Sequence, residues 1–275
     1  MASMLVILLL RPLQLSLPPM GDIFSSSAPL DVGFREMYNL QFEDAHRTFQ
    51  QWESAEPHDP MGPTADAAAC LFDEFNRLGV LQSNLFVNDG EFKKRKRPPP
   101  DPTLKARFEA DIAESDRLAD AVLKNSPNDS HALLSKTLNL GLRGDYLALV
   151  EKRDVASLSY IKNAGILAER LLAVDPECYD AYLAVGAENY ILGATPAPLR
   201  WVLRLYGAET DKEKGIRNLD LTATKGHYLL PYARLLLAVA ALRDNNRDEA
   251  RTLLQELARQ FPNNPLYQQE LSRLH

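Results

Sequence analysis

The feature that most constrains this fold is a helical spacing of apolar residues that recurs along most of the chain. Segments that carry apolar side chains at i, i+3 and i+4 are 34–54, 64–82, 104–125, 130–142, 145–174, 177–192, 212–225, 229–243, 247–260 and 265–274. Sustained alternation with a period of two residues, which indicates strands, is scarce. Pro, Gly, Asn and Asp separate the segments, as helix ends require. We therefore predict an all-α protein.

Prolines divide these predicted helices into similar units. The phrases "WESAEPHDP", "LKNSPND", "LLAVDPEC" and "LARQFPNNP" each end an apolar helix, and another helix begins shortly after the proline. Proline suits this place because the first turn of a helix does not need its missing N–H. Counting back from Pro262, Ala250 and Leu254 lie 12 and 8 residues earlier, as Ala45 and Phe49 do before Pro57. The spacing predicts a structural repeat.

The repeat resembles the tetratricopeptide repeat (TPR) family, whose motif is a pair of antiparallel helices with small residues at their contact and a proline after the second helix. The matching residues are Gly33, Phe42, Ala45, Phe49 and Pro57 in the first unit, Gly144, Tyr146, Ala164 and Pro176 in the third, and Ala238, Ala250, Leu254 and Pro262 in the last. Small residues let two helix backbones approach. The resemblance implies a TPR-like α-solenoid over residues 29–275, with four to five repeats and a C-terminal capping helix at its end.

Two segments depart from a regular repeat. Residues 145–174 contain no proline, and we expect them to form a single extended helix. The segment "PAPLRWVLRLYG" at 196–207 is inserted in the fourth unit and carries arginines beside aromatic residues. Such a helix can lie on a membrane surface, but we favour one that covers part of the core while its arginines reach water.

The N-terminal residues 1–28 carry the features of an export signal. Met4–Leu10 form an apolar run that is too short to span a bilayer, and small residues follow at Ser25–Ala28, where cleavage would occur. The departure from such signals is that no Lys or Arg precedes Leu5. We predict an exported protein, periplasmic or secreted. The alternative is a flexible N-terminal tail on a cytoplasmic protein.

A basic run, "EFKKRKRPPPDP", stands out at residues 91–102. The whole chain has a formal net charge of −6 and a pI near 5.5, whereas a nucleic-acid-binding domain is usually basic. We therefore predict that residues 88–103 form a solvated, proline-rich loop at the boundary between the first repeat and the rest. The alternative is contact with an anionic surface or nucleic acid through Lys93–Arg97.

The sequence contains no convincing catalytic or metal-binding motif. The five histidines do not pair at i, i+4, and neither a phosphate-binding glycine loop nor a GxSxG elbow occurs. Cys70 and Cys178 are far apart, and whether they pair stays open. We predict a protein that is not an enzyme and has no cofactor. The alternative is an enzyme or small-ligand binder with a site near Glu188–Tyr190, where polar residues enter an apolar helix.

The resemblance also implies where a partner would bind. In the family, the first helix of each repeat lines a concave groove that holds a segment of another protein. The corresponding positions here are Phe34, Met37, His131, Leu134, Leu138, Asp180, Leu183, Tyr190, Tyr232, Leu235, Val239 and Leu242. Because this set is mostly apolar, we expect an apolar or amphipathic partner segment. The alternative is that the chain's own insertions fill the groove.

Overall fold

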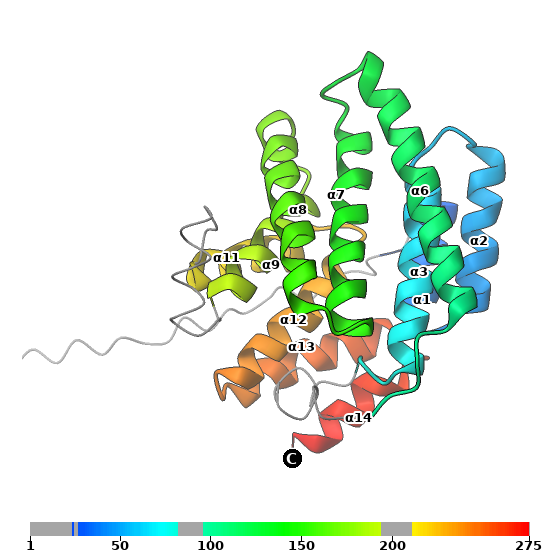
Figure 1. The fold of residues 1–275 in the computed structure, drawn as a ribbon. Helices are drawn as coiled ribbons and strands as arrows, with labels where there is room; N and C mark the ends of the chain where they lie inside the picture. Colours follow the sequence, from blue (N-terminus) through cyan, green and yellow to red (C-terminus); the bar gives the residue numbers. More distant parts are fainter. Residues whose placement is uncertain (1–23, 25–26, 82–95, 194–210, 275) are drawn as a thin grey trace, which may run out of the picture.

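The computed structural model describes residues 24, 27–81, 96–193 and 211–274, with only the backbone of 188–193. Within these ranges the chain is helical and has no strand, as predicted (Figure 1). Its helices are α1 (Pro29–Tyr38), α2 (Phe42–Ala55), α3 (Met61–Arg77), α6 (Pro102–Asn125), α7 (Ser130–Asp145), the π-helix η1 (Tyr146–Val150), α8 (Asp154–Val174), α9 (Ala181–Gly193), α11 (Lys212–Lys225), α12 (Leu230–Arg243), α13 (Arg247–Gln260) and α14 (Pro265–Arg273). None of them is long and apolar enough to cross a membrane.

Successive helices pack against each other in pairs: α1 with α2, α3 with α6, α7 with α8, α9 with α11, and α12 with α13. The second helix of a pair also packs against the first helix of the next pair, so the pairs stack in chain order. Helix α14 packs on α13 at the end of the stack. The architecture confirms the prediction of a TPR-like solenoid of stacked helix pairs with a C-terminal capping helix.

The small residues of the repeat lie where helices come closest. A Cβ atom added at Gly33 in α1 would overlap the ring of Phe49 in α2. At Gly186 in α9 it would lie 2.9 Å from the backbone nitrogen of Leu219 in α11. Ala250, one of the alanines that defined the repeat, is fully buried. Close backbone approach therefore accounts for the small residues, as the sequence predicted.

Two predicted helices are divided in the structure. The segment 34–54 turns at Leu40, whose φ of 61° separates α1 from α2. The segment 145–174 is also not one helix, because the chain leaves helical geometry at 151–153, where Lys152 has a φ of 55°. The Leu149 carbonyl accepts a hydrogen bond from Arg97 Nη1 at 2.8 Å, and Glu151 pairs with Lys105 Nζ at 2.7 Å. These tertiary contacts hold the interruption, and no proline is needed for it.

The basic loop lies within a helix pair. We predicted that residues 88–103 separate the first repeat from the rest, but the connection joins α3 to α6, the two helices of the second pair. Its described end is anchored to α3: Arg77 Nη2 donates to the Pro99 carbonyl at 2.7 Å, and the Asp101 amide donates to Glu74 Oε1 at 3.1 Å. Of the basic residues, Lys93 to Arg95 lie outside the described residues.

The first pair also contacts the last, which closes the stack on itself. Tyr38 in α1 donates a hydrogen bond from its hydroxyl to the Tyr228 carbonyl at 2.9 Å. Its own carbonyl accepts one from Asn264 Nδ2, also at 2.9 Å, across a sequence separation of 226 residues. Near the same seam, Asp31 Oδ1 lies 2.7 Å from His227 Nε2. The helices therefore form a closed assembly in which the ends of the repeat region support each other.

Candidate interaction surface

Aromatic rings from the first helices of different pairs meet on the inner face of the assembly. Phe72 in α3 packs edge-on against Tyr38 in α1 and Tyr232 in α12, with ring centroids 5.7 and 5.5 Å apart. Phe34 stacks on Tyr228 with centroids 4.6 Å apart. Such contacts are worth about 0.5–1.5 kcal/mol each beyond the area they bury. The chain's own side chains therefore occupy the centre of the inner face.

The structure places the predicted groove residues at three levels of exposure. Buried positions are Phe34, Met37, Leu134, Asp180, Leu235 and Val239. Half-buried positions are Leu138, Leu183, Tyr232 and Leu242, while His131 is exposed and the side chain of Tyr190 lies outside the described residues. Partner binding through this set stays a prediction. The alternative, in which the chain's own insertions fill the groove, also stays a prediction, because the insertion at 196–207 lies outside the described residues.

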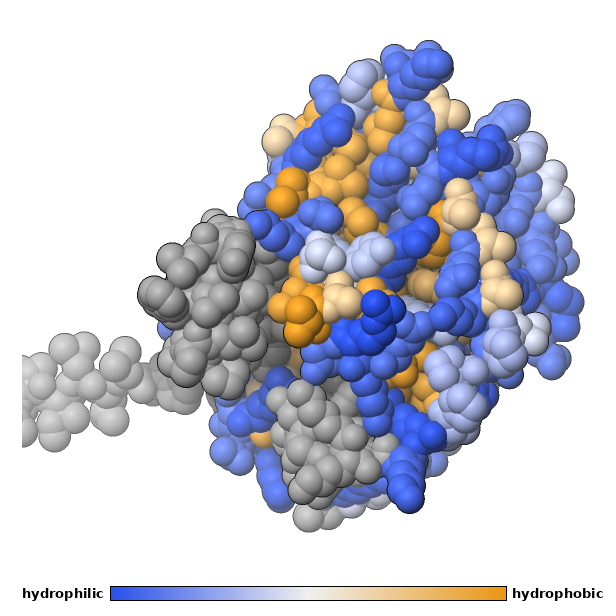
Figure 2. All heavy atoms as spheres, in the orientation of Figure 1, coloured by the Kyte–Doolittle hydropathy of each residue, from blue (hydrophilic) through white to orange (hydrophobic). Residues whose placement is uncertain are grey.

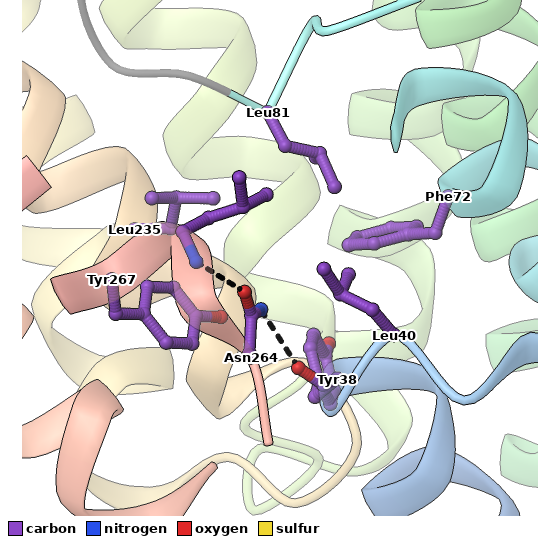
Figure 3. A pocket seen from close by; sticks show the side chains of 8 residues that line it. Tyr38, Leu40, Phe72, Leu81, Leu235, Asn264 and Tyr267 are labelled. Atoms are coloured by element: carbon purple, nitrogen blue, oxygen red, sulfur yellow. Dashed lines mark hydrogen bonds between the residues drawn. The ribbon is translucent and has the colours of Figure 1, made fainter. Parts of the chain in front are cut away.

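A small cavity remains beside the seam between the two ends of the chain (Figure 3). Tyr38, Leu40, Phe72, Leu81, Leu235, Asn264, Leu266 and Tyr267 line it. Asn264 lies at the edge of this cavity. Its Oδ1 accepts a hydrogen bond from the Leu266 amide at 3.0 Å, and its Nδ2 donates one to the Tyr38 carbonyl. The cavity volume is about 10 Å³, room for roughly one water molecule. It has no space for a substrate.

Two polar residues of the predicted groove have structural partners. The buried Asp180 carboxylate accepts hydrogen bonds from the amides of His227, Tyr228 and Leu229 at 2.9, 3.1 and 3.1 Å. Burial raises the pKa of Asp180, and these three bonds act in the opposite direction. His131 Nε2 lies 2.6 Å from Asp59 Oδ1, a hydrogen bond that raises the pKa of His131. Both side chains connect neighbouring elements of the fold.

A buried polar cluster, missed in the sequence, lies between α2, α3 and α6. Asp66 in α3 pairs with His46 Nδ1 and, at 2.6 Å, with Arg107 Nη2. Burial raises the pKa of the neighbouring Asp111 to about 7 and strongly raises that of the Cys70 thiol, so Cys70 lacks the thiolate character of a nucleophile. The available signal was Asp66 itself, a charge inside the small apolar run "TADAAAC".

This cluster has the contacts of a structural network. Its Asp66 carboxylate pairs with a guanidinium that joins α6 to α3 and contacts an imidazole that joins α2 to α3. Among the described residues, no group of three or more His, Cys, Asp and Glu is arranged to hold a metal ion. The alternative site near Glu188–Tyr190 lies where only the backbone is described.

The most exposed large apolar side chains of the described residues lie along one outer helix. Of the described residues, the large hydrophobic side chains at the surface are Val155, Ile166 and Val174, which are 84%, 55% and 42% exposed. All three belong to α8, the second helix of the third pair. Figure 2 shows hydrophobic side chains at the surface over α7 and α8. Because Val155 and Ile166 lie about three turns apart on the same side of this helix, the outer face of α8 is the candidate interaction surface.

The comparisons with known proteins give one structural likeness. No protein-family model matches the sequence, and no curated protein matches it either. A crystal structure described as a thermophilic TPR protein of Thermus thermophilus is 14% identical, with a TM-score of 0.45; the alignment covers 90% of this chain and 96% of that one. At this TM-score we infer nothing from the likeness. The TPR resemblance rests on the repeated residues and on the paired helices described above.

Proposed function

We propose that this protein is a non-enzymatic scaffold that binds an apolar or amphipathic segment of a partner protein. The observation that carries the proposal is the concentration of exposed apolar residues on α8, since Val155, Ile166 and Val174 all belong to this one outer helix. Burying the three side chains against a partner would contribute roughly 25 cal/mol for each Å² of apolar surface removed from water.

The inner groove is the less favoured surface for this scaffold. Phe34 and Tyr228 stack across the seam between the first and last pairs, and Phe72 fills the space between Tyr38 and Tyr232. A partner segment would have to displace these rings before it reached the inner positions. Binding on α8 requires no such rearrangement.

The polar groups support a scaffold over an enzyme. Asp180 holds the α11–α12 connection, His131 pairs with Asp59, and Asp66 holds both His46 and Arg107. The cavity beside Asn264 has space for about one water molecule. These groups therefore have structural partners where they lie.

The test is affinity capture of the full chain with mass spectrometry, using wild type and the double variant Val155→Asp/Ile166→Asp. A matched control, Thr252→Asp/Gln255→Asp, places two carboxylates on the exposed face of α13. We expect a defined protein set to bind wild type and the control, and to be lost from the α8 variant while its thermal unfolding stays unchanged. The same proteins on all three baits would contradict the proposal.

We also propose that the protein is exported, as its N-terminal apolar run favours. Phe24 limits where a leader would be cut, because its buried ring packs on Phe34, Tyr38 and Phe261. A cut within Ser25–Ala28 would remove this ring. N-terminal sequencing of the protein from its native cell should therefore give a first residue at or before Phe24, in material recovered outside the cytoplasm. Recovery in the cytoplasm alone would contradict export.

A further inference from the structure

The outer face of α8 carries a self-complementary pattern centred on Ile166. Side chains three, four and seven residues apart lie on one face of an α-helix. Lys162 precedes Ile166 by four residues, and Glu169 follows it by three. Ser159 and Ala173 lie seven residues to either side of Ile166. One stripe of α8 therefore carries a central apolar side chain, opposite charges beside it and a small residue toward each end.

This stripe faces away from the helices that hold α8 in the fold. Ala164, Ala168 and Leu171 are buried on the other side of α8, which packs on α7 and α9 (Figure 1). Within the stripe, Ile166 is 55% exposed, and the serine, the glutamate and the alanine are exposed as well. A second helix can therefore lie along the stripe without displacing any part of the fold.

A second copy of α8 complements this stripe when it lies antiparallel. About a two-fold axis close to Ile166, a residue ahead of the axis lies opposite one that is equally far behind it in the other copy. Lys162 then faces Glu169 of the second copy, and Glu169 faces Lys162 of the second copy, so both charge pairs are attractive. A parallel pair would instead place each charged side chain against its own counterpart, where like charges repel.

The centre of such a pair is apolar and allows a close approach. The two Ile166 side chains meet at the axis, and Ser159 and Ala173 leave room for the helix backbones. Lys162 is half-buried and also interacts within its own chain, but an ammonium has three donors and can hold a second carboxylate. Helix α8 has 21 residues and is about 31 Å long, so the contact is smaller than a standard interface and we expect weak association.

We propose that the outer face of α8 pairs with α8 of a second copy of this chain, antiparallel and with Ile166 at the two-fold axis. This inference rests on the proposed scaffold function, because it identifies the amphipathic partner segment as α8 itself. Charge complementarity selects this occupant. A different helix would need the same order of lysine, apolar residue and glutamate to satisfy both charges of the stripe.

The experiment is sedimentation equilibrium of the full chain over a series of concentrations. We expect the mass of wild type to rise with concentration from 30.8 kDa toward twice that value. Ile166→Asp, Lys162→Glu and Glu169→Lys should each weaken self-association at least about tenfold, because the first places a carboxylate in the apolar centre and the others bring like charges together. Lys124→Glu, at an exposed position on α6, is the control and should associate as wild type does.

Mixing the charge variants separates charge pairing from simple damage to the helix. A chain with Lys162→Glu carries two carboxylates on the stripe, and a chain with Glu169→Lys carries two ammonium groups. We expect these two variants to associate with each other more tightly than either does with itself, since both attractive pairs are then restored. The double variant Lys162→Glu/Glu169→Lys should self-associate as wild type does. Thermal unfolding at the lowest concentration verifies that each variant is folded.

The outcomes separate this inference from the proposed function. A wild type that stays at the mass of one chain at every concentration would overturn the self-pairing, whereas other proteins captured through α8 would still support the scaffold. Self-association that Ile166→Asp and the charge variants leave unchanged would place the contact on another surface and overturn the inference too. Failure of the proposed function has a different signature, namely the same captured proteins on wild type and on the α8 variant.

Discussion

At the scale of single residues, the repeat depends on side-chain size where helix backbones meet. Gly33 faces the ring of Phe49, so even a methyl group has no room there. Gly141 in α7 is different, because a Cβ atom at that position meets no neighbour within 4 Å. The two glycines therefore differ in what they contribute, although both lie inside helices.

This contrast predicts opposite effects of the same substitution. Gly33→Ala should lower the free energy of unfolding by about 1–3 kcal/mol, because the Phe49 ring must move. Gly141→Ala should raise it by about 0.5–1 kcal/mol, because alanine favours helix and nothing obstructs it. Urea denaturation followed by circular dichroism measures both. Equal changes in the two variants would contradict the close-approach explanation.

The buried polar cluster predicts a pH dependence of stability. Burial, with the charge of Asp66, raises the pKa of Asp111 to about 7 in the folded protein, whereas an unfolded Asp titrates near 3.9. Between these values the folded state holds a proton that the unfolded state has released. The free energy of unfolding should therefore fall as pH rises from about 4 to about 7.

Asp111→Asn should remove this loss of stability with rising pH. We expect the variant to be more stable than wild type by roughly 1–2 kcal/mol at pH 8, with a much smaller gain at pH 4. Urea unfolding at pH 4, 6 and 8 gives the comparison. Asp120→Asn, whose side chain is 65% exposed, is the control and should change little at any pH. A gain for Asp111→Asn that is the same at pH 4 and pH 8 would rule out the titration.

At the scale of helices, Asp180 precedes α9 and yet holds the connection between α11 and α12 by accepting hydrogen bonds from the three backbone amides of residues 227–229. By comparison, Asp129 caps its own helix, α7, by accepting the Ala132 amide at 2.9 Å. The sequence predicted a groove position for Asp180 from its register in the helical pattern. That register carries no information about the distant segment 227–229.

The two carboxylates predict different costs on substitution. Asp180→Ala would leave three amides of the α11–α12 connection without their acceptor, and the free energy of unfolding should fall by about 2–4 kcal/mol. Asp129→Ala should lower it by about 1 kcal/mol, because one cap bond is lost at a less buried site. Guanidinium titrations of both variants decide this. If Asp180→Ala costs no more than Asp129→Ala, the long-range hydrogen bonds of Asp180 are not an important support.

At the scale of the whole molecule, the contacts between the first and last pairs turn a stack of repeats into a closed assembly. Phe24 lies at the centre of this seam, 1% exposed, between rings of α1 and the Phe261 ring that follows α13. In an open solenoid each repeat is supported only by its neighbours. Closure adds a support for the terminal pairs that does not depend on adjacent repeats.

Removing the central ring should therefore weaken the whole fold. Phe24→Ala is expected to lower the free energy of unfolding by about 3–5 kcal/mol, which corresponds to a lower midpoint in thermal unfolding. Val174→Ala, at an exposed site on α8, should change it by less than about 0.5 kcal/mol. Differential scanning calorimetry measures both. A Phe24→Ala protein with the wild-type midpoint would show that the seam contributes little.

Much of the fold was predictable because its signals are local. The i, i+3, i+4 spacing identified the helices, and Ala45, Phe49, Ala250 and Leu254 identified the buried second helices, since helix pairing is a contact between nearby segments. The turns at Leu40 and Lys152 were missed. Neither residue favours a positive φ, so local composition did not indicate them.

The sequence by itself determined the all-α class, the pairing of helices and the positions that must stay small. Only the tertiary structure decided that Tyr38 meets Tyr228 and Asn264, that Asp180 holds the α11–α12 connection, and that Phe72 fills the inner face. The physical reason is range. Helix formation and pairing depend on residues a few turns apart. The contact between the two ends depends instead on the rotation from each helix pair to the next, summed over all the pairs, and no single segment encodes that sum.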